Sequence, residues 1–165
     1  MKKYFYYFLI ACCMLSFPLV NSVNVNALPM EGMSTITNAE KVTQAIPKLV
    51  KLEQITPNQI QITYDRDVDL NSAQKATNYW VQSTKEATPT GIATLGKNEK
   101  VNSKNALTND LVTIKPMNNS KNTFILTFKN NIKPGMEHKL IICYVIVPGA
   151  PPYNGDNGSA VFVGK

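Results

Sequence analysis

The chain contains few of the residues on which most enzymes and nucleic-acid readers depend. Its 165 residues include one histidine, His138, one arginine, Arg66, and three cysteines. A single histidine disfavours histidine-based catalysis, and neither G-x-S-x-G nor H-E-x-x-H occurs in the sequence. Clusters of arginine interleaved with aromatic residues, which nucleic-acid binding favours, are also missing. A nucleic-acid partner is therefore not expected, and a secreted hydrolase is the weakest of the functional hypotheses.

Long apolar runs are scarce as well, and the longest lies near the N-terminus. Residues 4–20 are almost all apolar, follow two lysines and precede small polar residues. This order is typical of a secretory signal peptide. Val25 and Ala27 fit the small-residue positions of a cleavage site, so the sequence predicts a signal peptide over residues 1–27. We expect the protein to be secreted or to lie at the cell surface.

Other fates of the N-terminus stay open. Cleavage after Ser22 is a second possibility, and an uncleaved membrane anchor is a third, although Pro18 interrupts a run at the short limit for a bilayer. The segment Leu9-Ile10-Ala11-Cys12 resembles the lipobox of bacterial lipoproteins, in which the cysteine is acylated. Contact with a membrane is therefore expected only through an uncleaved signal or a lipidated Cys12.

The cysteines provide no internal disulfide once the signal peptide is removed. Cleavage after residue 27 takes away Cys12 and Cys13 and leaves Cys143, which lies in an apolar run. That setting is typical of an inert buried thiol. A hydrophobic content of 44% with 17% charged residues supports one packed core, so the stability of the domain must come from packing.

The remaining chain divides into a leader and one domain. Residues 28–47 are polar without a clear period and read as a linker, whereas residues 48–165 consist of short apolar stretches bounded by Pro, Gly, Asn and Asp. The spacing typical of long helices is missing there. We expect a single domain that is mainly β.

Alternation of apolar and polar residues marks the clearest strands. Gln59–Tyr64 and Thr123–Phe128 alternate strictly, and Leu111–Lys115 precedes the second of these across a turn region, which predicts a hairpin. Further strands are predicted at residues 48–53, 78–83, 91–95, 138–147 and 159–164. The unbroken apolar stretch within the fourth of these predicts a strand covered on both faces or one running over the sheet edge. The pattern predicts an antiparallel β-sandwich of seven or eight strands, with a small closed barrel as the alternative.

Three segments resemble the bacterial immunoglobulin-like modules of surface-layer and other cell-surface proteins. They are Leu52–Asp69, which ends in YDRDVD, Ala76–Val81, which reads ATNYWV, and Ile132–Leu140, which reads IKPGMEHKL. The closing NGDNG and FVG segments occupy the places of the last loop and strand of that family. The resemblance covers residues 48–165 and implies an immunoglobulin-like sandwich in an extracellular setting. It implies no activity, because such modules serve as spacers, adhesins and carbohydrate binders.

Three aspartates form a candidate metal site. Asp65, Asp67 and Asp69 occupy alternate positions, so in an extended strand their carboxylates would project to one side and could hold a calcium ion, with Asp156 as a further ligand. The alternative is a solvated turn in which the carboxylates cap backbone amides and Arg66 offsets their charge. Apart from this possible calcium ion, no cofactor is expected.

The loop before the last strand is a candidate binding site. Residues 148–158 make a long connection, and loops on rigid sandwiches commonly carry binding residues. The candidate ligand-binding residues are Tyr153, Asn154, Asp156 and Asn157. The alternative is a plain surface connection with Tyr153 packed over the end of the sandwich.

Other notable residues favour structural roles. Tyr79 and Trp80 follow each other in a strand and must point to opposite faces. We favour Trp80 as the core residue, with stacking on a sugar as the second interpretation. His138 has no nucleophile motif beside it and is expected to be structural. Residues 97–105 read as a solvated loop, and weak contact with anionic envelope polymer is the alternative.

These observations favour an exported, non-enzymatic immunoglobulin-like module with a structural or adhesive role at the cell surface. Its partner would be a cell-envelope polymer, a carbohydrate or a protein at the surface. The alternative function is a small carbohydrate-binding module. An exposed ring among Tyr79, Trp80, Tyr144 and Tyr153 would favour that alternative, and burial of all four would count against it.

Overall fold

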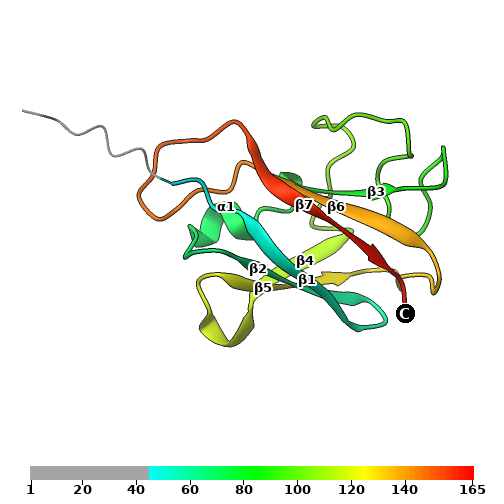
Figure 1. Ribbon diagram of the computed structural model, residues 1–165, viewed down its shortest axis with the longest axis horizontal. Helices are drawn as coiled ribbons and strands as arrows, with labels where there is room; N and C mark the ends of the chain where they lie inside the picture. Colours follow the sequence, from blue (N-terminus) through cyan, green and yellow to red (C-terminus); the bar gives the residue numbers. More distant parts are fainter. Residues whose placement is uncertain (1–44) are drawn as a thin grey trace, which may run out of the picture. The chain divides into compact units, whose positions relative to one another are not determined.

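Two antiparallel sheets contain almost all of the regular structure in residues 45–165, which are the residues that this computed structural model describes (Figure 1). The strands are β1 (Leu49–Thr56), β2 (Gln59–Tyr64), β3 (Tyr79–Ser83), β4 (Val112–Pro116), β5 (Thr123–Phe128), β6 (Glu137–Cys143) and β7 (Asp156–Val163). Short helical elements are α1 (Leu70–Gln74) and the 3-10 turns η1 (Ala76–Asn78) and η2 (Met117–Asn119).

Several expectations concern residues outside the described part. The signal peptide at residues 1–27, the lipidation of Cys12 and all but the last residues of the linker at 28–47 lie there. Within residues 45–165, no helix has the length and apolar character needed to cross a lipid bilayer.

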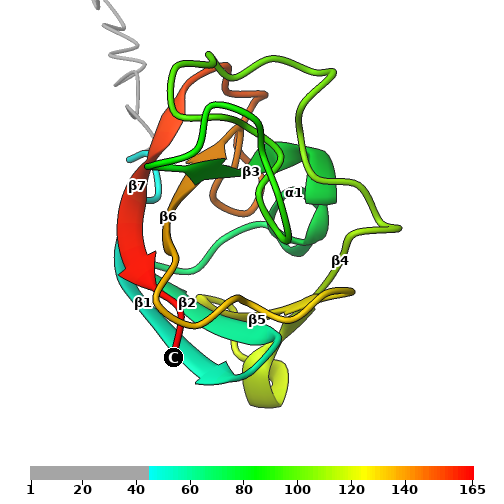
Figure 2. The same ribbon diagram turned by 90° about the vertical axis from the view of Figure 1, so that its right-hand side faces the viewer.

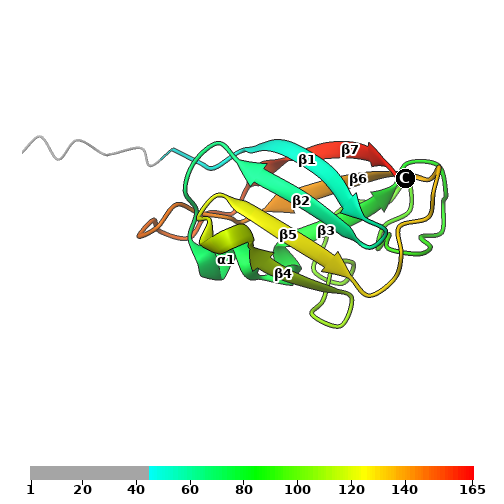
Figure 3. The same ribbon diagram turned by 90° about the horizontal axis from the view of Figure 1, so that it is seen from below.

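The strand order matches the expected sandwich. One sheet has the order β1-β2-β5-β4 and the other β3-β6-β7, and every pairing within them is antiparallel. This is the arrangement of a seven-stranded immunoglobulin constant-type sandwich. Seen from its end, the three-stranded sheet lies over the four-stranded one, and β1 and β7 lie beside each other at one side (Figures 2 and 3). The prediction of an all-β antiparallel sandwich is confirmed.

Apolar and polar residues alternate along β2 and β5, so that the apolar side chains of both strands face the core between the sheets. Ile60 and Ile62 of β2 are fully buried and pair in register with Leu126 and Phe124 of β5. The predicted hairpin is present, because β4 and β5 pair across the turn that contains η2. Burial of these aliphatic and aromatic side chains is the main stabilising contribution to such a core.

Several predicted strands have other bounds in the structure, and one predicted strand is absent from the described residues. The strand predicted at 138–147 ends at Cys143, because Tyr144 takes a φ of +67° and turns the chain out of the sheet. It is nevertheless the central strand of its sheet, as the apolar run predicts. Residues 91–95 form no strand: Gly91 has a φ of +66°, and Leu95 alone bridges to Gln82. The last strand begins at Asp156 rather than at residue 159.

A long loop over residues 84–111 creates a second apolar cluster on the outer side of β3 and β6. Trp80 is 2% exposed and packs there with Leu95, Ala106 and Cys143. Tyr79 points between the sheets and is fully buried as well. Trp80 is therefore a core residue, as expected, but the expectation that only one of the two is buried is wrong, because the loop covers the outer face.

His138 lies on the inner side of β6 and is 3% exposed. Its ring packs against Phe162 of β7 with ring centroids 5.6 Å apart, and neither ring nitrogen has a hydrogen-bond partner in residues 45–165. Burial lowers the pKa of His138 below its ordinary value, and the carboxylate of Glu86 opposes this only in part. The folded protein therefore favours the neutral ring.

Acidification is expected to destabilise the protein through His138. The unfolded chain binds a proton at this residue near pH 6.5 and the folded chain binds it only at lower pH, so this contribution to stability is complete above about pH 6.5 and is lost as pH falls through the folded pKa. The melting temperature should fall between about pH 7.5 and about pH 5, and His138→Phe should flatten that dependence. Thermal denaturation of both proteins tests this directly, since the chain has no other histidine. An unchanged slope in the variant would contradict it.

Candidate ligand-binding groove

Two of the three aspartates of the candidate metal site, Asp65 and Asp69, make contacts within the chain. Asp65 accepts hydrogen bonds from Arg66, and this contact holds the pKa of the Asp65 carboxyl at about 2. Asp69 is the N-cap of α1 and accepts from the amide of Ser72 at 2.7 Å. Because β2 ends at Tyr64, the alternation that would align the carboxylates, Asp67 included, does not continue. Residues 45–165 contain no group of three or more His, Cys, Asp or Glu side chains placed to hold a metal ion.

Asn157, one of the four candidate ligand-binding residues, holds the base of the β6–β7 loop. It is fully buried, and its Oδ1 accepts from the amide of Val145 at 2.8 Å. Its Nδ2 donates to the carbonyls of Val145 and Pro47 at 2.8 and 2.9 Å. The side chain thus closes the loop and ties it to the segment that enters β1. Burial leaves no part of it on the surface.

Asp156 also acts on the backbone. It lies at the start of β7, where its Oδ1 accepts from the amide of Gly158 at 2.7 Å. Its carbonyl accepts from the hydroxyl of Tyr153 at 3.3 Å and from the ammonium of Lys48 at 2.8 Å. Asp156 does not line the groove between the β6–β7 loop and α1.

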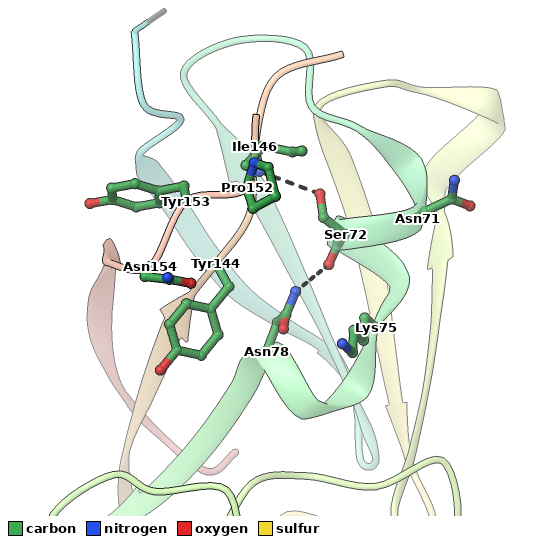
Figure 4. Close-up of a pocket in the computed structure, with 9 residues that line it drawn as sticks. All are labelled: Asn71, Ser72, Lys75, Asn78, Tyr144, Ile146, Pro152, Tyr153 and Asn154. Carbon is green, nitrogen blue, oxygen red and sulfur yellow. Dashed lines mark hydrogen bonds between the residues drawn. The ribbon is translucent and has the colours of Figure 1, made fainter. Parts of the chain in front are cut away.

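Tyr153 and Asn154, the other two candidates, do line a groove between the β6–β7 loop and α1 (Figure 4). The groove has a volume of about 420 Å³, which lies within the usual range for small-molecule sites. Its lining residues are Tyr144, Ile146, Pro152, Tyr153 and Asn154 from the loop, and Asn71, Ser72, Lys75 and Asn78 from α1 and η1.

Hydrogen bonds fix the two walls of the groove to each other. The amide of Ile146 donates to Ser72 Oγ at 3.3 Å, and the amide of Asp69 donates to the carbonyl of Ile146 at 2.8 Å. Asn78 Nδ2 donates to the carbonyl of Ser72 at 2.8 Å, which orients its amide beside the groove (Figure 4). The groove is therefore held in its shape before any ligand arrives.

Tyr144 is the most unusual residue of the groove. It is 43% exposed, and its φ of +67° is rare for an aromatic residue. Its amide donates to the carbonyl of Gly155, and its ring meets Trp80 edge to face at a centroid distance of 6.1 Å. Backbone strain of this kind persists only where surrounding structure enforces it, and it concentrates at functional sites. Here it directs a large ring into the groove.

Tyr153 is held close to its own loop. A side chain at Gly155 would collide with the Tyr153 ring, so the absence of a Cβ there lets the ring lie against the backbone. Tyr153 is half-buried and lines the groove.

Polar groups with free hydrogen-bonding capacity complete the lining. Within residues 45–165, the side chains of Asn71, Lys75 and Asn154 make no hydrogen bond. Amides both donate and accept, and an ammonium donates. Together with the rings, they can hold a ligand that has an apolar face and several hydroxyl groups.

Sequence reasoning missed the helical wall, and it named Tyr144 only as one of four rings whose exposure would favour carbohydrate binding, without placing it in a groove. The pattern over residues 70–78 contains too few apolar positions to predict a helix of one turn, although Asp69 followed by Ser72 is a usable N-cap signal. Tyr144 lies in an apolar run that reads as continuous strand, and nothing local predicts the turn at that position.

Comparison with known proteins supports the fold. No protein-family model matches the chain, and no curated protein matches it. The crystal structure of the S-layer protein rSbsC(31-844) is similar over 72% of this chain, with 13% identity and a TM-score of 0.52. The structure of surface layer protein SbsC, domains 1-6, is similar over 72% of this chain, with 12% identity and a TM-score of 0.50. This chain covers 14% of the length of each, so the likeness concerns one part of those proteins and their fold.

Proposed function

We propose that this protein is an exported, non-enzymatic immunoglobulin-like module of the cell surface that binds a carbohydrate in the groove between α1 and the β6–β7 loop. The signal-peptide pattern of residues 1–27 supports export. The immunoglobulin-type strand order and the likeness of fold to the S-layer protein SbsC support a role in cell-surface structure or adhesion.

The exposed ring of Tyr144 is the observation that favours a carbohydrate as the ligand. Sugar rings present a face of C–H groups and a rim of hydroxyls, which match an aromatic ring surrounded by amides. Tyr144 supplies the ring, and Asn71 and Asn154 supply amides without other partners in the described residues. Tyr79 and Trp80 are buried and take no part in such stacking.

The composition of the groove supports binding without catalysis. Its lining contains no carboxylate, histidine or cysteine. Its one serine, Ser72, donates through Oγ to the carbonyl of Asp69 and accepts from Ile146, so no base activates it. General acid–base chemistry most often uses a histidine or a carboxylate, and the lining of this groove has neither.

Replacing Tyr144 by asparagine tests the proposal. Asparagine tolerates a positive φ, so Tyr144→Asn should leave the melting temperature unchanged or slightly raised while it removes the ring. We expect binding to a glycan on an array of defined oligosaccharides to weaken by about 2 kcal/mol, roughly thirtyfold in Kd, which is typical of an interface hot spot.

Val161→Thr is the matched control, because Val161 is 57% exposed on β7 and does not line the groove. Its binding should equal that of the wild type. Absence of wild-type binding to every glycan, or wild-type affinity in Tyr144→Asn, would contradict the proposal.

Export has its own test at the N-terminus. Mass spectrometry of the protein isolated from native cells should find a first residue of Leu28, as expected for cleavage after Ala27. An acylated Cys12 would establish lipidation instead, and an intact Met1 on a cytoplasmic protein would contradict export.

A further inference from the structure

A second hollow adjoins the groove on the other side of α1. It has a volume of about 660 Å³ and is lined by α1 and η1 and by the segment that leads into β4. The lining residues are Asn71, Gln74, Lys75, Ala76, Thr77, Thr108, Asn109 and Asp110. Asn71 and Lys75 line both hollows, so the two meet along α1. Asn71 and Lys75 project from the helical wall (Figure 4).

The second hollow has the chemistry of a site for hydroxyl groups. Its lining is made mostly of small polar side chains, and those of Thr77, Asn109 and Asp110 make no hydrogen bond within residues 45–165. A carboxylate accepts from hydroxyls, while amide and threonine groups both donate and accept. No large aromatic ring lines it, so it offers hydrogen bonds rather than a stacking platform.

The charges along the two hollows cancel. Lys75 and Asp110 are the only ionised side chains in the two linings. The whole chain has a formal net charge of +6, so nonspecific attraction to an anionic polymer would depend on residues elsewhere and would be screened by salt. A ligand that follows the two hollows meets no net charge.

From this arrangement we infer that the two hollows form one track for a linear, uncharged glycan, with one unit against Tyr144 and later units hydrogen-bonded around Thr77, Asn109 and Asp110. The inference rests on the proposed function, because the Tyr144 groove is its first subsite. It adds that the ligand is a polymer and that affinity grows with chain length.

Calorimetric titration with neutral linear oligosaccharides tests the track. The probes are β-1,4-linked glucose, N-acetylglucosamine, mannose and xylose series of two to eight units, titrated into the full chain. We expect affinity in at least one series to rise by about tenfold or more from two to six units and then to level off, as linked subsites add their contributions. The affinity should change by less than about twofold between low and high salt.

Three variants separate this inference from the proposed function. The double variant Asn109→Ala/Asp110→Ala should bind the six-unit probe about as weakly as the two-unit probe and leave the two-unit affinity unchanged. Tyr144→Asn should weaken both. Asn131→Ala changes an exposed asparagine of the β5–β6 connection that lines neither hollow, and it should change neither affinity.

Each outcome decides one of the two claims. Equal affinity at all lengths, or a double variant that binds long probes like the wild type, overturns the track and leaves the groove intact. Wild-type binding by Tyr144→Asn overturns the proposed function, and absence of binding in every series overturns the track.

Discussion

Replacing Trp80 by alanine is expected to lower the free energy of unfolding by about 3 to 5 kcal/mol, the usual cost of removing a large buried aromatic side chain. Trp80 is the centre of the cluster under the loop over residues 84–111. Its Nε1 donates to the carbonyl of Asn102 at 2.9 Å and to Asn105 Oδ1 at 3.1 Å. The substitution therefore removes the packing of the indole and two of the hydrogen bonds that hold the loop to the sheet.

Two measurements separate loss of the loop from loss of the fold. Urea denaturation gives the change in stability, and limited trypsin digestion reports the loop, because Lys97, Lys100 and Lys104 are exposed within it. In Trp80→Ala, we expect cleavage at these lysines under conditions in which the wild type stays intact. Trp80→Phe keeps a ring in the cluster and should cost about 2 kcal/mol, through the lost N–H and a smaller cavity. An unchanged urea midpoint in Trp80→Ala would contradict the assignment of Trp80 to the core.

Replacing Asn157 by alanine is expected to cost about 3 kcal/mol, because buried backbone groups lose their partners. The amide and carbonyl of Val145 and the carbonyl of Pro47 all bond to this one side chain. The β6–β7 loop should also lose its fixed path, so the groove formed by Tyr144 and Tyr153 should lose its ligand. Chemical denaturation and glycan binding measure the two effects.

Asp156→Ala is the control for this prediction. Asp156 precedes Asn157 and is an equal candidate for ligand binding by sequence. It is exposed, however, and its carboxylate accepts one hydrogen bond, from the amide of Gly158. We expect a cost of about 1 kcal/mol or less and unchanged binding. A larger loss of stability in Asp156→Ala than in Asn157→Ala would show that the exposed carboxylate, and not the buried amide, holds the loop.

Local alternation made much of the fold predictable. Gln59–Tyr64 and Thr123–Phe128 are strands with the expected faces inside, since a period of two residues fits one buried side of a sheet and no helix. The prediction of a strand at residues 91–95 is wrong, because apolar composition alone was its basis. Ile92 and Leu95 are buried, but a loop that covers a sheet also buries apolar residues, and composition does not distinguish the two cases.

The candidate site was predictable only in part. A long loop rich in Pro, Gly and Asn pointed to Tyr153 and Asn154, and both line the groove. The opposite wall, formed by Asn71, Ser72 and Asn78, lies far away in the sequence. It comes close because Ala73 and Val145 are buried in the same core cluster and because hydrogen bonds link Ile146 to Ser72 and Asp69. No local pattern encodes a contact across that separation.

The all-β class, the antiparallel sandwich and most of the strands can be read from the amino-acid sequence, because they follow from periodicity, turn residues and burial of one strand face. The roles of individual polar and aromatic residues depend instead on contacts that form when the chain folds. Trp80 is buried because a distant loop covers it, Asn157 is an anchor because its amide meets two other backbone segments, and Tyr144 is exposed because the strand ends one residue before it. Each role depends on neighbours that the folded chain brings together from distant positions.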